Sequence, residues 1–170
     1  DFIAIPPKIA SVLYAADRFE SSSQIKDWLK AGYVVVADRY ASANQIHQGG
    51  KLVDVRERTR FLGWLDQMEF KIFSIPRPDI IIYLHVPLAI GQKLINQRVL
   101  ENKNKKTVKA KKDLAESNLK YLAESQASAI SIVKKSNNWQ MVDCARDGKI
   151  LERDEIHKLI YAKVSKLINK

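Results

Sequence analysis

The sequence predicts an α/β fold in which a parallel sheet is flanked by helices. Three short runs rich in β-branched residues, 34–37, 80–84 and 140–143, have the composition of strands. The first two are almost wholly apolar, as expected for strands buried on both faces of a parallel sheet. Stretches with helical spacing separate the three runs, and this alternation of strands and helices is typical of parallel sheets.

Length and composition predict a single globular domain spanning residues 1–170. Hydrophobic residues make up 46% and charged residues 28% of the 170 positions, which is ordinary for a soluble protein. No apolar run reaches the roughly 18 residues that a membrane span requires, and the sequence opens without the basic start of a signal peptide. The lone cysteine, Cys144, has no partner for an internal disulfide. These observations predict a cytoplasmic protein.

Helical segments are expected on both sides of the first strand. The segment 6–20 begins with two prolines, which a first helical turn tolerates. A second helix is expected over 23–31, because Gly32 is a good helix-ending residue. A third is expected over 54–73, where apolar residues recur at three- and four-residue spacing. Its apolar positions are Phe61, Leu62, Leu65, Met68 and Ile72.

The first strand is followed by Asp38-Arg39-Tyr40, the most informative short motif of the chain. Ligands of open α/β sheets bind at the carboxyl ends of strands. A carboxylate beside a guanidinium could there hold a metal-bound water and a phosphate together, because arginine matches phosphate oxygens with two donors. A salt bridge that caps the strand is the simpler alternative.

Two residue pairs with a spacing of four add to this motif. Asn44 and Gln48 would share one helical face, and carboxamides carry both the donors and the acceptors needed to read the edge of a pyrimidine base. Tyr14 and Arg18 have the same spacing, so an aromatic ring and a cation could stack on a base and neutralise a phosphate. Alternatively, Tyr14 belongs to the core and Arg18 pairs with Asp17 or Glu20.

The net charge of +10 is concentrated in one segment. Residues 103–112 contain six lysines and no acid. The segment is either a solvated loop or a site for an anion, such as a nucleotide polyphosphate or nucleic acid. A basic nucleic-acid-binding domain is a remote alternative for the whole chain, and it would show steeply salt-dependent binding to long polynucleotides.

Together, these segments resemble the thymidylate kinase family of P-loop nucleoside monophosphate kinases. The order and spacing of the segments match along nearly the whole chain. The matching segments are 13–20 (LYAADRFE), 38–40 (DRY), Asn44, 48–49 (QG), 78–84 (PDIIIYL) and 137–143 (NNWQMVD). The resemblance implies a P-loop kinase-like sheet, transfer of a phosphoryl group from ATP to dTMP giving dTDP, and a homodimer built through the apolar helices near Leu13 and Leu62.

The resemblance also assigns roles on the acceptor side. Tyr14 falls where the family stacks an aromatic ring on thymine. Arg18 and Arg39 fall where arginines contact the base and the dTMP phosphate, so Arg39 is expected to be catalytic. Asn44 and Gln48 match positions that face the thymine edge.

Further roles concern the sugar, the metal and the donor. His47 stands where the family usually has an aromatic residue near the sugar, and Asp38 matches an acid that helps to hold Mg²⁺ through water. Arg98 matches an arginine near ATP, so both Asp38 and Arg98 are expected to be catalytic. The basic segment, at about 99–113, lies where the family places its lid. The expected phosphate-binding lysines are Lys103, Lys105, Lys106 and Lys109.

The sequence departs from the family most clearly at the donor site. The P-loop motif Gly-x-x-x-x-Gly-Lys-Ser/Thr does not occur in it; Gly49-Gly50-Lys51 lacks the spacing. We therefore expect an N-terminally incomplete copy of a longer enzyme, without its N-terminal strand and P-loop, and expect these 170 residues to be inactive alone. The alternatives are another nucleotide or deoxynucleoside kinase of this fold, or a catalytically dead nucleotide-binding homologue.

Overall fold

The computed structural model describes residues 4–104 and 118–168 and divides the chain into two compact units. The first unit contains Asp1–Asp79 and Glu124–Ser131, and the second contains Ile80–Ala123 and Ile132–Lys170. The prediction of one domain over 1–170 stays a prediction. Within the described ranges, no helix has both the length and the apolar character needed to cross a membrane.

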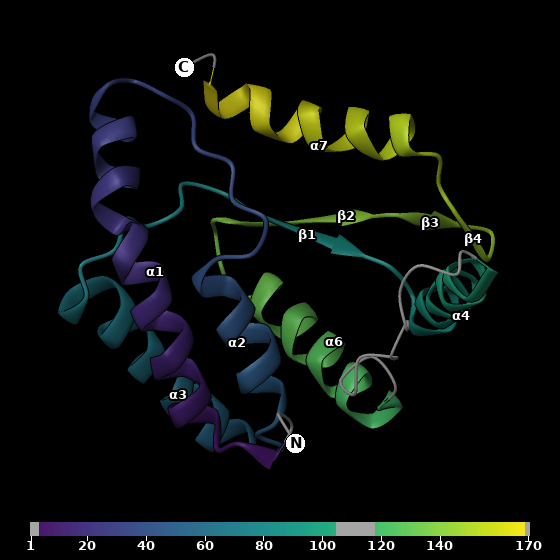
Figure 1. Ribbon diagram of the computed structural model, residues 1–170, viewed down its shortest axis with the longest axis horizontal. Helices are drawn as coiled ribbons and strands as arrows, with labels where there is room; N and C mark the ends of the chain where they lie inside the picture. Colours follow the sequence, from purple (N-terminus) through teal and green to yellow (C-terminus); the bar gives the residue numbers. More distant parts are fainter. Residues whose placement is uncertain (1–3, 105–117, 169–170) are drawn as a thin grey trace. The chain divides into compact units, whose positions relative to one another are not determined.

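The first unit is built from helices. Its long first helix, α1 (Pro7–Lys30), packs against α2 (Ala41–Gly50), and α2 packs against α3 (Val55–Gln67), which continues into the π-helical segment η2 (Met68–Ile72) (Figure 1). The central residues of α6 (Leu119–Val133) complete the unit. A core cluster of Ala15, Phe61, Leu65 and Met68 packs α1 against α3 and η2.

Helix α1 merges two segments that the sequence predicts as separate helices. Both outer ends agree with the prediction to within one residue, since the helix starts at Pro7 and stops at Lys30, and Gly32 follows with a φ of 85°. The amide of Gly32 donates to the Leu29 carbonyl at 3.0 Å, and that of Tyr33 donates to Trp28 at 3.0 Å. This Schellman pattern needs a left-handed residue after the helix, which glycine adopts without steric cost.

The strand predicted at 34–37 is not formed, which corrects that expectation. This segment has no strand partner within the described residues, where the sheets are β1–β2 and β3–β4. Val36 is 90% exposed. Apolar composition indicates a strand only where a neighbour supplies backbone hydrogen bonds, because a strand cannot satisfy its own amides and carbonyls.

Close helix packing explains why a glycine ends α2. A Cβ placed on Gly50 would lie 2.9 Å from the Ser125 Cα of α6, a distance that real Cβ atoms essentially never show. Gly50 therefore lets the α2 backbone lie directly on α6. At Gly49 a Cβ would lie 3.4 Å from the Ser128 hydroxyl, which is ordinary van der Waals contact.

The second unit carries the parallel sheet and confirms the α/β class. Strand β1 (Ile81–His85) pairs in parallel with β2 (Trp139–Asp143), with Ile81 opposite Trp139 and His85 opposite Asp143. Helix α7 (Arg153–Ile168) packs on β2, and α4 (Leu88–Asn104) follows β1. A short hairpin of β3 (Ala145–Arg146) and β4 (Lys149–Ile150) turns at Asp147-Gly148, both with positive φ.

Candidate functional site

The acceptor-side residues predicted from the sequence all lie in the first unit. They come from α1, from α2 and from the segment between these helices. Arg98 lies in the second unit, exposed on α4. Only the backbone of Lys103 is described, as part of the same helix, and Lys105, Lys106 and Lys109 lie outside the described residues. The predicted residues of the first unit are Tyr14, Arg18, Asp38, Arg39, Asn44, His47 and Gln48.

A buried ion pair joins α1 to η2. The Arg18 Nε donates to Oε2 of Glu69 at 3.1 Å, and its Nη2 contacts Oε1 of the same carboxylate. The side chains are 13% and 1% exposed, respectively. Two parallel bonds fix the plane of the guanidinium as well as its position. Arg18 is therefore a rigidly held cation rather than a mobile surface charge.

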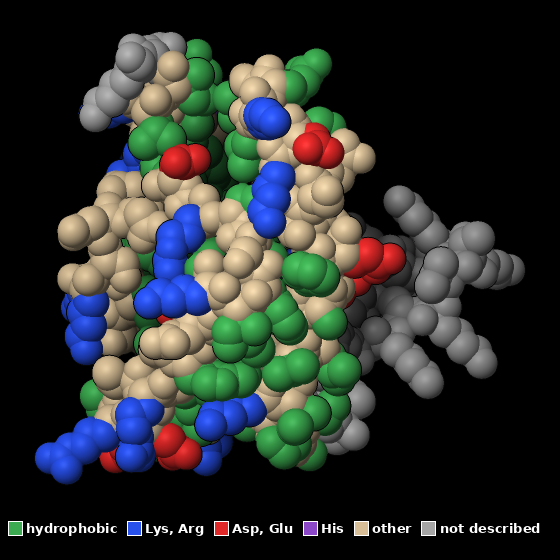
Figure 2. All heavy atoms as spheres, turned by 90° about the vertical axis from the view of Figure 1, so that its left-hand side faces the viewer, with side chains coloured by type: hydrophobic (Ala, Val, Ile, Leu, Met, Phe, Trp, Pro, Cys, Tyr) green, Lys and Arg blue, Asp and Glu red, His purple; other side chains and the backbone are tan. Residues whose placement is uncertain are grey.

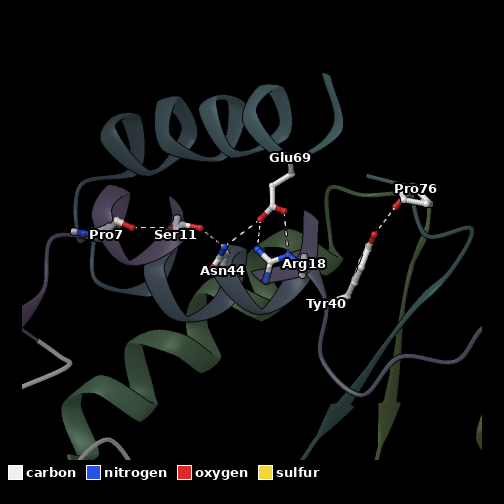
Figure 3. Close-up of polar contacts among 7 residues, drawn as sticks. All are labelled: Pro7, Ser11, Arg18, Tyr40, Asn44, Glu69 and Pro76. Atoms are coloured by element: carbon white, nitrogen blue, oxygen red, sulfur yellow. Dashed lines mark hydrogen bonds and ion pairs between the residues drawn. The ribbon is translucent and has the colours of Figure 1, made fainter. Parts of the chain in front are cut away.

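Asn44 of α2 joins the same cluster (Figure 3). Its Nδ2 donates to Oε1 of Glu69 at 3.1 Å and to the backbone carbonyl of Ser11 at 3.3 Å. The Ser11 hydroxyl in turn donates to the Pro7 carbonyl at 2.8 Å. With only 3% of Asn44 exposed, these bonds hold its amide in one orientation between three helical segments.

Tyr40, the last residue of the Asp-Arg-Tyr motif, anchors the start of α2. Its hydroxyl donates to the Pro76 carbonyl at 3.1 Å (Figure 3). Burial raises the pKa of this phenol, the negative charge of Glu69 raises it further, and Arg18 lowers it in part. Tyr40 is thus a neutral donor that ties the motif to the segment after η2.

Asp38 and Arg39 are exposed in the turn before α2. The backbone of Arg39 has a φ of 65°, a left-handed conformation that few non-glycine residues adopt. Such conformations persist only where the surroundings hold them, and they are frequent at functional sites. The exposed guanidinium of Arg39 is available to an anion, in contrast to the paired one of Arg18.

The other two predicted residues of α2 differ in their surroundings. Burial lowers the pKa of His47, and the positive charge of Arg39 lowers it further, so this imidazole is neutral at pH 7. Gln48 is 1% exposed, and its side-chain oxygen is buried with no hydrogen-bond partner among the described residues. A buried acceptor without a partner is uncommon in proteins. Tyr14, by contrast, is 44% exposed on α1.

Glu69 is the residue that the sequence analysis missed. It was overlooked because the helical pattern assigns the inward face to apolar residues, Ile72 among them. In the structure Ile72 is 72% exposed and Glu69 is buried. The available signal was an acid four residues after Leu65, on the apolar face of the predicted helix. The π-helical turn that places it there has no sequence signature we could use.

The carboxylate of Asp38 is the feature of this site to consider for a divalent cation. No group of three or more His, Cys, Asp or Glu residues that could hold a metal occurs in the described part of the chain. Mg²⁺ keeps several waters and commonly binds one or two carboxylates together with substrate phosphates. The exposed carboxylate of Asp38 fits such a water-rich role.

Comparisons with known proteins agree on the family. The thymidylate kinase family model matches residues 3–154. A probable thymidylate kinase of Thermococcus gammatolerans is 31% identical over 92% of this chain and 69% of its own length. One of Thermococcus onnurineus is 33% identical over 73% of this chain. The thymidylate kinase of Mesoplasma florum is 26% identical over 93% of this chain and 73% of its own.

The aligned part of the chain covers only 56% of the Thermococcus onnurineus relative. The match to the family model nevertheless runs through both compact units, from the helices that carry Arg18 and Asn44 to the strand that ends at Asp143. On these grounds, the chain belongs to the thymidylate kinase family.

Proposed function

We propose that the protein acts in the transfer of a phosphoryl group from ATP to the 5′-phosphate of dTMP, which gives dTDP. A phosphate oxygen is already a competent nucleophile, so the reaction needs no general base. Positioning of the two phosphates and neutralisation of their charge carry the rate. Family membership and the arrangement of the first unit support this function.

The supporting observation is the convergence of Arg18 and Asn44 on the buried carboxylate of Glu69. A fixed cation beside a fixed carboxamide suits recognition of a planar base carried next to a phosphate. In this proposal, the exposed Tyr14 stacks on the base, and the unpartnered oxygen of Gln48 serves its edge. The sequence resemblance supplies these assignments.

The remaining roles concern the sugar, the phosphates and the donor. We assign the neutral His47 to the deoxyribose and the exposed Arg39 to the acceptor phosphate, where its two donors would act catalytically. Asp38 would hold Mg²⁺ through water, and a bound ion would supply neutralisation of phosphate charge. Arg98 and the lid lysines, Lys103, Lys105, Lys106 and Lys109, are assigned to the ATP side.

The sequence contains no P-loop motif, so we propose that these 170 residues bind the acceptor without turning over ATP by themselves. We also propose a homodimer in the cytoplasm. Helix α1 exposes Ile9, Leu13 and Phe19 by 57%, 63% and 51%. Figure 2, which views the side where α1 lies in Figure 1, shows hydrophobic side chains gathered there among basic ones.

Calorimetric titration of the chain with nucleotides tests the acceptor site without depending on the donor. We expect dTMP to bind more tightly than dUMP, and both to bind more tightly than dCMP or thymidine. Arg39→Ala should weaken dTMP binding by about tenfold or more, the loss expected for one charge-assisted contact. Arg56→Ala, which removes an exposed arginine at the start of α3, is the matched control and should change nothing.

Two outcomes would count against the proposal. Equal affinity for dTMP and thymidine would show that the protein does not recognise the phosphate. Failure of dTMP to bind would show that the proposed acceptor site does not exist.

A further inference from the structure

Glu69 is the centre of the polar cluster in the first unit. Its carboxylate is 1% exposed, and both oxygens accept hydrogen bonds, Oε2 from Arg18 and Oε1 from Arg18 and Asn44. A carboxylate in this position cannot approach an anionic ligand productively, because like charges repel in a buried site. Whatever Glu69 does for a nucleotide, it does through the two side chains that it holds.

The orientation of the Asn44 amide follows from the chemistry of its neighbours. Oε1 of Glu69 and the Ser11 carbonyl lie 3.1 and 3.3 Å from Nδ2. Both neighbours can only accept hydrogen bonds, so only the NH₂ group of the amide can face them. A flipped amide would set its own oxygen against two other oxygens. Asn44 therefore has its two N–H groups committed and can offer a ligand only its Oδ1, an acceptor.

We propose that Glu69 is a positioning residue that sets the base preference of the acceptor site. By holding the Asn44 amide in this orientation, it makes the site select a pyrimidine whose ring nitrogen carries a proton. Thymine and uracil have such an N–H donor, whereas the corresponding nitrogen of cytosine is an acceptor and would face Oδ1 with no proton between them. The inference rests on the proposed function only in that a pyrimidine nucleotide binds beside Asn44.

A purely structural role for the same cluster makes a different prediction. An ion pair that merely ties α1 to η2 would lower stability when broken, and would weaken dTMP, dUMP and dCMP alike through loosening of the unit. A positioning role changes the ratio between bases with and without the ring proton. The ratio is therefore the decisive quantity, and absolute affinity alone is not.

The test is the variant Glu69→Gln, measured by calorimetry against dTMP, dUMP and dCMP. The glutamine keeps the size of the side chain but replaces one oxygen by an NH₂, so it can turn a donor toward Asn44. A flipped Asn44 amide would then still be opposed by the Ser11 carbonyl at 3.3 Å but no longer by the side chain at position 69. We expect the ratio of dTMP to dCMP affinity to fall by about tenfold or more. This is the effect expected when one hydrogen bond in a buried site is lost or faces the wrong group. The ratio of dTMP to dUMP should not change, because both bases carry the ring proton.

Asp66→Asn is the matched control. It makes the same carboxylate-to-amide change three residues earlier, in a bidentate pair with Arg77 that is exposed and outside the cluster. All three affinities should stay at the values of the unmodified protein. A Glu69→Gln protein that folds and retains the original dTMP to dCMP ratio would overturn the inference, while dTMP binding in the unmodified protein would leave the proposed function standing. Absence of dTMP binding in the unmodified protein would overturn both.

A measurement on the unmodified protein can still refute the inference if Glu69→Gln does not fold. With selective ¹⁵N labelling of asparagine, the two side-chain amide protons of Asn44 should exchange slowly with solvent. Addition of dTMP should leave that slow exchange in place, because the ligand meets only Oδ1. Fast exchange of either proton in the free protein would contradict the fixed amide and with it the proposed role of Glu69.

Discussion

Two arginine–carboxylate pairs have their carboxylates on neighbouring turns of the same continuous helix. One pair is buried and the other is exposed to solvent. Arg18 and Glu69 are 13% and 1% exposed, whereas Arg77 and Asp66 are 56% and 38% exposed. Both pairs are bidentate, and the exposed one has the regular distances of 2.6 and 2.8 Å. The chemistry of the contact is therefore the same, and the surroundings differ.

The difference shows what burial adds to an ion pair. Water and salt screen the exposed pair, which contributes little to stability. The buried pair has lost its hydration, so each charge is stabilised mainly by the other. Asn44 donates a further hydrogen bond to the carboxylate. The buried pair can consequently fix the positions of neighbouring side chains, while the exposed pair is a surface ion pair with little effect on its neighbours.

Removal of each carboxylate should separate the pairs most strongly. Glu69→Ala leaves Arg18 as an uncompensated buried cation and should lower the free energy of unfolding by about 3–5 kcal/mol. Asp66→Ala should lower it by about 0–1 kcal/mol. Urea unfolding followed by circular dichroism measures both. Losses of similar size would mean that burial does not distinguish the pairs.

Replacement of each arginine by lysine tests the importance of the planar fork. Arg18→Lys keeps the charge but gives up one of two buried bonds, which should cost about 1.5–3 kcal/mol of stability. Arg77→Lys also gives up the stacking of its guanidinium carbon 4.1 Å above the Phe70 ring, an exposed contact that should cost about 0.5–1 kcal/mol. Thermal unfolding of the two variants provides the ranking, and a reversed order would break the comparison.

Salt should act on one pair and not on the other. Double-mutant cycles give the coupling energy within each pair at 0.05 M and 1 M sodium chloride. The coupling of Asp66 with Arg77 should disappear at high salt, where the screening length is about 3 Å. The coupling of Glu69 with Arg18 should persist. If both couplings vanish, the cluster in the first unit is open to solvent.

Acidification should have the smallest of these effects on the exposed pair. Hydrogen bonds from Arg77 hold the pKa of Asp66 below its usual value, with burial opposing them in part. A carboxylate with a lowered pKa in the folded state stabilises the fold above its unfolded pKa of about 4, and this contribution is lost as pH falls through the folded value. The stability difference between Asp66→Asn and the unmodified protein should therefore shrink below about pH 4, by less than about 1 kcal/mol. A difference that grows on acidification would reverse this sign.

The fold class could be predicted because its signals are local. Apolar strands, helical periodicity and the helix-ending Gly32 are all visible in short windows of sequence. The segment 34–37 shows where that method fails, since its valines predict a strand but pairing depends on a neighbour elsewhere in the chain. Local propensity states what a segment can form, and tertiary context decides what it forms.

For the candidate site, the sequence identified two members of the polar cluster and missed the third. Arg18 and Asn44 stood out by residue type and spacing, and the structure brings them together. Glu69 did not stand out, because a single acid in an amphipathic helix is usually read as a solvent-facing residue. The structure shows only that Arg18 and Asn44 meet at Glu69. The roles of all the predicted site residues stay predictions: Tyr14, Arg18, Asp38, Arg39, Asn44, His47, Gln48, Arg98 and the lid lysines.

The π-helical turn at Met68–Ile72 has a consequence for how this helix could change. Its hydrogen bonds span five residues instead of four, so it accommodates one residue more than a regular turn. Deleting a single position there would restore regular spacing and give a straighter and more ordinary helix. The same deletion would shift the side chains around it and disturb the carboxylate of Glu69 that Arg18 contacts. On the proposed role of Glu69, a deletion that makes the helix more regular should therefore impair the discrimination between nucleotides.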